Sequence, residues 1–220
     1  MRRIKLAVMD GIWTEWLSHF ESVSNKIEAI AARTDEELAA RIVDADVVRT
    51  NTAGAFDAAM AEHALALILS WTGGIITAEP NRHDRVYTRE IPVSQIDGRR
   101  VCVLSLRTLG RNVSIRLHHI GMHVIAVDAQ VSAPPEGVDE LVASDGMHTA
   151  LGKADFVVVA LPLTEGTRGL IDQSCFASIL DHAYLVNVAR GPIVNQSDHI
   201  KALQSQTIAG AGIDVFEEEP

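Results

Sequence analysis

Cysteine is scarce in this sequence, and its scarcity limits the kinds of site that the chain can build. Only Cys102 and Cys175 occur among 220 residues, far apart and without a CxxC partner. A disulfide framework needs more thiols, and a structural zinc site needs closely spaced ones. We therefore expect no metal site, and we expect a reducing, cytoplasmic location.

Long apolar runs and an excess of positive charge are also lacking. The longest uncharged stretch, residues 64–78, contains Gly73 and Gly74 and is shorter than the about 20 apolar residues that cross a bilayer. Near the start, Lys5 and Asp10 interrupt the apolar run, and no small-residue cleavage site follows. The formal net charge of −10 disfavours a protein that binds phosphate backbones. The sequence thus predicts neither a membrane nor a nucleic acid as partner.

What the chain does have is a regular alternation of apolar and helical segments. The first part is typical of a βαβαβ fragment, with strands at 4–9, 27–30 and 47–48. Helices are expected over 13–20 and from Thr34, which begins the capping-box sequence TDEE.

A second pattern begins after this fragment. The Ala- and Leu-rich sequence TNTAGAFDAAMAEHALALILSW predicts one helix of about 17 residues, apolar on most faces and therefore packed between layers. Residues 79–98 are polar, carry two prolines and are expected to form a loop.

From Arg99 onward, five apolar runs predict five strands: RRVCVLSL, HVIAVD, DFVVVALP, AYLVNVA and TIAGAGIDVF. Uninterrupted apolar runs suit strands that are covered on both faces, as in a parallel sheet with helices on each side. We therefore predict an α/β fold with a doubly wound, Rossmann-like parallel sheet.

The turn after the first of these strands departs from the usual dinucleotide-binding pattern. Where G-x-G-x-x-G is expected between strand and helix, the sequence is S-L-R-T-L-G. Ser105 and Arg107 replace the first two glycines, Gly110 is the third, and a helix is expected from near Asn112. Asp128 ends the next strand, about 20 positions on, where a carboxylate accepts hydrogen bonds from the adenosine ribose.

These two replacements leave the affinity for a dinucleotide open. Ser105 can make the tight turn only if the backbone angles required there lie outside the Gly-only region. The side chain of Arg107 should block the backbone's approach to the pyrophosphate unless the loop shifts, and a shifted loop could offer its guanidinium to a phosphate. The alternatives are weakened or absent binding, and retained binding in a changed pose.

Five blocks of sequence resemble a single family. In chain order they are AEHALALIL, GMHVIAVD, LPLTEGTRGLID, LVNVARGPIV and AGAGIDVFEEEP. Together they look like the D-isomer-specific 2-hydroxyacid dehydrogenase family, from Asn51 to Pro220. The resemblance implies an NAD-binding Rossmann domain at 51–220, which includes the long entry helix. It also implies a flavodoxin-like substrate domain that is only partly present, as residues 1–50.

The resemblance also implies an activity. Members of this family are NAD-dependent oxidoreductases that transfer a hydride between a D-2-hydroxy acid and its 2-oxo acid, usually as homodimers with the active site between the two domains. A small 2-oxo or 2-hydroxy acid is thus the expected substrate, and a homodimer is the expected assembly. Because Asp128 rather than a basic residue stands at the ribose position, NAD is expected to be preferred over NADP.

Individual residues match positions that have roles in the family. Arg190 resembles the catalytic arginine, whose planar fork holds the substrate carboxylate and polarises the carbonyl. Glu219 matches the glutamate that keeps the catalytic histidine cationic, and Asp214 resembles the residue beside the nicotinamide carboxamide. The residues expected to contact the cofactor are Ser105, Arg107, Thr108, Leu109, Gly110, Asp128, Leu161, Pro162, Thr167, Val188, Ala189 and Asp214.

Simpler interpretations of the same residues stay open. Arg190 could be a surface arginine, Glu219 part of an acidic loop, and Asp128 only the end of a strand. His63, in AEHAL, is expected to be packed in the core or at an interface. In the family, the proton-donating histidine follows a block like EEEP. None of the nine histidines has a matching context, so we assign no general acid.

The substrate half also departs from the family. A Gly-rich loop that would bind the substrate carboxylate is not found between Val48 and Asn51. Two hypotheses follow from the sequence. The chain is an active dehydrogenase, or it is a catalytically impaired relative, a pseudoenzyme, that serves as a dinucleotide-binding or dimerising module.

Overall fold

The structure is a computed structural model, and it describes residues 4–9, 27–32, 47–49 and 57–218. The chain divides into two units, Met1–Ala55 and Phe56–Pro220. Each unit is described by itself below.

The first unit contains a three-stranded parallel sheet. Its strands are β1 (Ile4–Met9), β2 (Ile27–Ala32) and β3 (Val47–Arg49), in the order β2-β1-β3. The three strands predicted from the sequence are confirmed. The predicted helices over 13–20 and from Thr34 lie outside the described residues.

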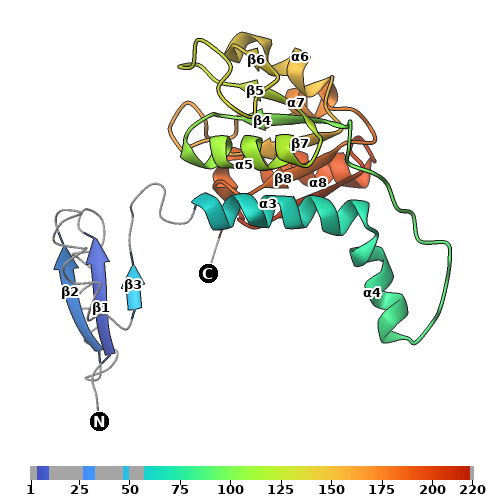
Figure 1. The fold of residues 1–220 in the computed structure, drawn as a ribbon, viewed down its shortest axis with the longest axis horizontal. Helices are drawn as coiled ribbons and strands as arrows, with labels where there is room; N and C mark the ends of the chain where they lie inside the picture. Colours follow the sequence, from blue (N-terminus) through green and yellow to red (C-terminus); the bar gives the residue numbers. More distant parts are fainter. Residues whose placement is uncertain (1–3, 10–26, 33–46, 50–56, 219–220) are drawn as a thin grey trace. The chain divides into compact units, whose positions relative to one another are not determined.

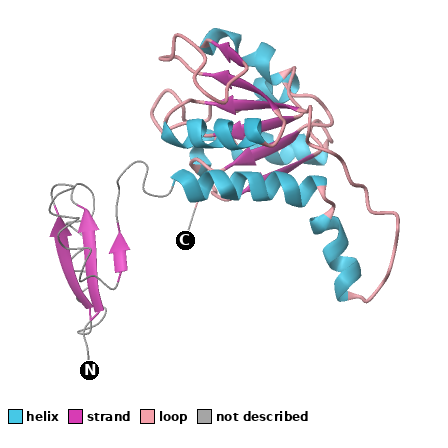
Figure 2. Cartoon of the chain, in the orientation of Figure 1, coloured by secondary structure: helices cyan, strands magenta, loops and turns pink. Residues whose placement is uncertain are grey.

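The second unit is built on a six-stranded, all-parallel sheet with the order β6-β5-β4-β7-β8-β9. The strands of this sheet are the larger group of magenta arrows in Figure 2. Chain order runs outward from β4 in one direction and then from β7 in the other, so the sheet is doubly wound and β4 and β7 flank its topological switch point. The predicted fold class is confirmed. The strands are β4 (Arg100–Leu104), β5 (His123–Val127), β6 (Glu140–Val142), β7 (Phe156–Val159), β8 (Tyr184–Asn187) and β9 (Gly210–Ile213).

Helices cover both faces of this sheet (Figure 1). Residues of β4 alternate between two core layers, so Val103 packs with the α3 and α5 side and Cys102 with the α6, α7 and α8 side. This two-sided burial explains why the strand sequences are apolar throughout. The α-helices are α3 (Asp57–Thr72), α4 (Ile75–His83), α5 (Thr108–His119), α6 (Met147–Leu151), α7 (Gln173–Ser178) and α8 (Gln196–Gln204), with 3₁₀ turns η1 (Ser144–Gly146) and η2 (Gly191–Ile193).

Two boundaries differ from the sequence predictions. The loop expected over 79–98 is wrong at its start, because α4 extends to His83. None of the residues of α4 is buried, so this helix carries no apolar periodicity that could have revealed it. The helix expected from near Asn112 begins earlier, at Thr108. Strand β6 was not predicted, because it is short and only half-buried.

The long Ala- and Leu-rich helix is confirmed as α3, and it ends at a glycine pair. Gly74 has a φ of 65° at the start of α4, a conformation that favours glycine. No single helix within the described ranges is long and apolar enough to cross a membrane. Helices α3 and α4 pass that test only when taken together, and they are bent by 65° at the glycine break.

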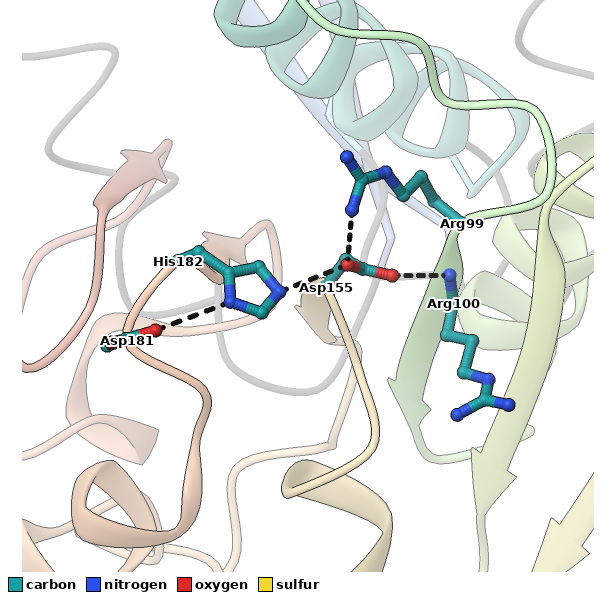
Figure 3. A network of polar contacts seen from close by, with 5 residues as sticks. All are labelled: Arg99, Arg100, Asp155, Asp181 and His182. Carbon is teal, nitrogen blue, oxygen red and sulfur yellow. Dashed lines mark hydrogen bonds and ion pairs between the residues drawn. The ribbon is translucent and has the colours of Figure 1, made fainter.

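A polar network ties together the amino ends of three central strands (Figure 3). The carboxylate of Asp155, just before β7, accepts hydrogen bonds from Arg100 N at 2.8 Å and Arg99 Nη1 at 2.9 Å. His182, just before β8, places Nε2 3.1 Å from the same carboxylate and Nδ1 3.3 Å from Asp181. Burial works to raise the pKa of Asp155, but the bonds from Arg100, His182 and Arg99 outweigh it and hold the pKa below its usual range.

We predict that Asp155→Asn lowers the free energy of unfolding by about 1–3 kcal/mol at neutral pH, because it weakens bonds to a partly buried charge. A carboxylate with a depressed pKa stabilises the fold above its ordinary pKa of about 3.9 and loses that contribution as the pH falls through the folded-state pKa. Urea unfolding of wild type and variant should therefore converge in acid. Asp181→Asn is the control, since Asp181 is exposed and its carboxylate pairs only with His182 among the residues that the structure describes. Equal stability of Asp155→Asn and wild type at pH 7 would contradict the role of Asp155.

Candidate functional site

A cavity of about 390 Å³ lies at the carboxyl ends of β4, β5 and β7. In doubly wound sheets, ligands bind outside the carboxyl ends of the strands at the switch point, and a cavity of this size is typical of small-molecule sites. Six residues predicted to contact a cofactor line it together: Ser105, Arg107, Asp128, Leu161, Pro162 and Thr167.

Ser105 makes the tight turn after β4 in a strained conformation. Its φ is 84°, in the left-handed region that costs a non-glycine residue about 1–2 kcal/mol. The residue is buried, and its amide donates to Val127 O at 2.8 Å. Its hydroxyl accepts a hydrogen bond from Arg107 N at 3.3 Å. The turn therefore keeps a glycine-type shape although a serine occupies it.

The carboxylate of Asp128 holds this turn from the end of β5. Its Oδ2 accepts from Leu106 N at 2.7 Å, and its Oδ1 accepts from Gln130 N at 2.8 Å and Val131 N at 3.2 Å. Burial works to raise the pKa of Asp128, but these amide bonds and the Ser105 hydroxyl outweigh it and lower the pKa. Asp128 is thus ionised at neutral pH and lines the cavity, so ending the strand and accepting a ribose hydroxyl are compatible roles for it.

Gly110 allows α5 to start directly against the turn. A Cβ built at Gly110 would lie 1.8 Å from Ser105 O, so no other residue fits without moving the backbone. The amino end of α5 has no side-chain cap, which leaves its N–H groups available to an anion. Arg107 is exposed at the rim of the cavity beside this helix end. Thr108 is exposed, whereas Leu109 packs against the core on the α3 side.

The loop after β7 forms the opposite wall of the cavity. Thr167 Oγ1 donates to Pro162 O at 2.6 Å and accepts from Thr164 N at 2.8 Å. The two hydrogen bonds of the Thr167 hydroxyl therefore join separate parts of this loop and fix the positions of Leu161 and Pro162, which line the cavity.

A second group of predicted residues lies at the carboxyl ends of β8 and β9 and does not line the cavity. Val188 and Ala189 are buried in the two core layers. Arg190 is exposed, and its Nη1 donates to Ala189 O at 2.7 Å. Asp214 follows β9, and its Oδ1 lies 3.2 Å from Nε2 of His63 on α3. Glu219 lies outside the described residues.

Asn187, which sequence reasoning missed, organises this second group. Its side chain accepts a hydrogen bond from Ala189 N at 3.1 Å and donates to Arg190 O at 3.4 Å. Its backbone carbonyl accepts from Asp214 N at 3.1 Å. A buried polar residue at the end of an otherwise apolar strand was the signal that could have revealed it.

Gly191 brings the loops after β8 and β9 into direct backbone contact. A Cβ at Gly191 would lie 1.7 Å from Phe216 O. Because a backbone carbonyl cannot turn away as a flexible side chain can, the two loops depend on this glycine for their spacing.

Comparison with known proteins identifies the second unit. Residues 65–220 match the NAD binding domain of the D-isomer specific 2-hydroxyacid dehydrogenases. The chain belongs to this family. The match assigns a nicotinamide dinucleotide as the cofactor class of this domain. It does not distinguish NAD from NADP.

Two curated members of the family show how much of a longer protein the chain corresponds to. It is 37% identical over 164 residues to D-3-phosphoglycerate dehydrogenase of Mycobacterium leprae, covering 73% of this chain and 30% of that protein. It is 31% identical over 176 residues to glyoxylate reductase of Thermofilum pendens, covering 78% of this chain and 52% of that protein. The chain thus spans about 30% of the length of the first relative and about half of the second.

Solved structures of the family share the fold. A D-isomer specific 2-hydroxyacid dehydrogenase from Xanthobacter autotrophicus Py2, solved with NADPH and MES, is 34% identical, with a TM-score of 0.69 over 83% of this chain and 75% of that one. Phosphoglycerate dehydrogenase from Lactobacillus plantarum is 24% identical, with a TM-score of 0.71 over 98% of this chain and 83% of that one.

The contact between Gly110 and the turn gives a direct test of the site. Gly110→Ala should lower the free energy of unfolding by about 1–3 kcal/mol, because the new methyl group overpacks the turn, and it should abolish NADH binding. Thermal unfolding and NADH titration measure the two effects. Gly166→Ala is the matched control for stability, since a Cβ there meets no atom within 4 Å; equal melting temperatures for both variants would contradict the packing role of Gly110.

Proposed function

We propose that this chain carries the NAD-binding half of an oxidoreductase that transfers a hydride between a D-2-hydroxy acid and the cofactor. The observation that carries the proposal is the arrangement around Asp128. An ionised carboxylate, a glycine-type turn and an uncapped helix amino end meet at one cavity in a domain of this family. These groups suit the ribose and pyrophosphate of a dinucleotide.

The residues at the ends of β8 and β9 would act on the substrate side. The guanidinium of Arg190 is exposed there and is suited to hold the carboxylate of a 2-oxo acid in a bidentate geometry and to polarise its carbonyl. Bound NADH would supply the hydride. The role of Arg190 is to orient C2 of the substrate, and its backbone is held in place by Asn187.

We propose NAD rather than NADP as the preferred cofactor. The Asp128 carboxylate is held ionised at the ribose end of the cavity, where it would repel the 2′-phosphate of NADP and accept hydrogen bonds from the free hydroxyl of NAD. Arg107, exposed on the rim, is the nearby cation that works in the opposite direction.

The second candidate function is that of a module that binds a dinucleotide or dimerises without catalysing the reaction. Arg107 is the observation that favours it. Its Cβ stands at the second glycine position, where the backbone normally approaches the pyrophosphate. Oxidation of NADH with a panel of small 2-oxo acids separates the two candidates, because only the dehydrogenase consumes the cofactor.

The wild-type chain should bind NADH weakly, and Ser105→Gly with Arg107→Gly should restore tight binding. Arg107→Ala is the sharper comparison. It removes the charge but keeps the Cβ, so it should not restore binding if the Cβ is the obstacle. Tryptophan emission during NADH and NADPH titrations measures all three proteins. Low-micromolar binding of NADH by the wild type would show that Arg107 is no obstacle.

We also propose that the second unit forms a homodimer through α4 and the segment that follows it. Ile75 and Ile76 are 60% and 52% exposed, and Val86, Tyr87 and Val93 are exposed nearby in the sequence. Clustered exposed apolar side chains mark interaction surfaces.

The structure holds free thiols at Cys102 and Cys175, both buried, which suits the reducing cytoplasm that we propose as its location.

Ile75→Lys with Ile76→Lys should convert a dimer into a monomer, because two charges would have to be desolvated at the interface. Light scattering at equal protein concentrations measures the mass. Ile200→Lys places the same charge on α8, at another exposed isoleucine, and should leave the dimer intact. A monomeric wild type would refute this interface.

A further inference from the structure

His63 and Asp214 join α3 to the carboxyl end of β9. His63 Nε2 lies 3.2 Å from Asp214 Oδ1, and the two side chains keep 44% and 36% of their surface exposed. The pair is therefore held together and still open to a ligand. The neighbours Ala61 and Ala64 are buried against the sheet, so α3 presents His63 from a fixed support.

The main chain of Asp214 is held by the sheet. Its amide donates to Asn187 O at 3.1 Å, which continues the pairing of β8 with β9. With both backbones fixed, the contact with His63 decides where the carboxylate points. Oδ2 makes no hydrogen bond or ion pair within residues 57–218, so it remains available as an acceptor.

The position of Asp214 in the sheet indicates which part of a dinucleotide it would meet. In a doubly wound fold, each half of the sheet binds one mononucleotide on its side of the switch point. Asp128 belongs to the half that contains β4, β5 and β6, and the 390 Å³ cavity beside it extends as far as the loop after β7, at the switch point. Asp214 follows β9 in the other half, which leaves it the nicotinamide mononucleotide.

We propose that His63 is a positioning residue for the nicotinamide. By bonding Oδ1 of Asp214, it directs Oδ2 toward the N–H groups of a primary amide, the carboxamide of the nicotinamide ring. This inference rests on the proposed function. It adds a residue of the long entry helix to the cofactor site and leaves the adenosine half of that site unaffected.

Two ligands separate this role from a structural one. NADH carries the nicotinamide, whereas ADP-ribose keeps the adenosine, the two phosphates and the second ribose but lacks the nicotinamide ring. In the full chain, His63→Leu should weaken NADH binding about fivefold to tenfold, the scale of one ordinary hydrogen bond, and should leave ADP-ribose binding unchanged. His63→Gln, whose side-chain amide can donate to the same oxygen, should recover most of the NADH affinity.

The neighbouring residue on α3 supplies the matched control. Glu62 pairs with Arg116 of α5 at 3.3 Å, so Glu62→Gln removes an anchor of the same helix away from Asp214 and should change neither affinity. Equal weakening of both ligands by His63→Leu, or no change in either, would overturn the positioning role while the proposed function stands. A wild type that binds neither ligand overturns the proposed function, and this inference with it.

Discussion

The hydrogen bond from the amide of Leu106 to the carboxylate of Asp128 is the interaction on which the candidate site depends. It joins the turn after β4 to the end of β5, and these two neighbouring strands border the cavity at their carboxyl ends. Ser105 has a strained backbone conformation, and such a conformation persists only where surrounding contacts hold it. The hydrogen bond from the turn to the Asp128 carboxylate is the contact that holds it here. The bond also keeps Asp128 ionised, so the same contact sets both the shape and the charge of the cavity.

A different kind of constraint operates at the other half of the sheet. There the loops after β8 and β9 are held by main-chain contacts, with Asn187 bonded to both and Gly191 packed on Phe216. Arg190 and Asp214 lie in one region because β8 and β9 are paired in parallel and both residues follow the carboxyl ends of these strands. The half of the sheet with Asp128 thus relies on a side-chain charge, and the other half relies on a neutral amide side chain and close backbone packing.

Much of this organisation could be predicted from the sequence, because it rests on local chemistry. Gly110 and the spacing to Asp128 indicated the turn, the helix that follows it and a carboxylate at the end of the next strand, and the apolar runs indicated five of the six strands of the second sheet. Strand β6 and helix α4 could not be predicted, because the strand is short and half-buried and the helix has no buried residue, so neither carries a hydrophobic period.

The remaining differences come from contacts between residues far apart in the chain. The pairing of His63 with Asp214 and the role of Asn187 depend on which strands become neighbours, and no local pattern records that. Leu109 was predicted to contact the cofactor; α5 begins at Thr108, and in the structure this leucine is partly buried and packs against the core on the α3 side.

The burial of Cys102 in the central strand has a consequence for how the fold can be followed in solution. Its side chain is fully buried between layers, and burial, with a smaller effect of the Glu140 charge, raises the pKa of its thiol to about 12. A thiol reacts as its thiolate, so Cys102 is inert as long as β4 stays covered. Its labelling by a thiol reagent therefore reports opening of the middle of the sheet, and the chain carries its own internal probe of global unfolding.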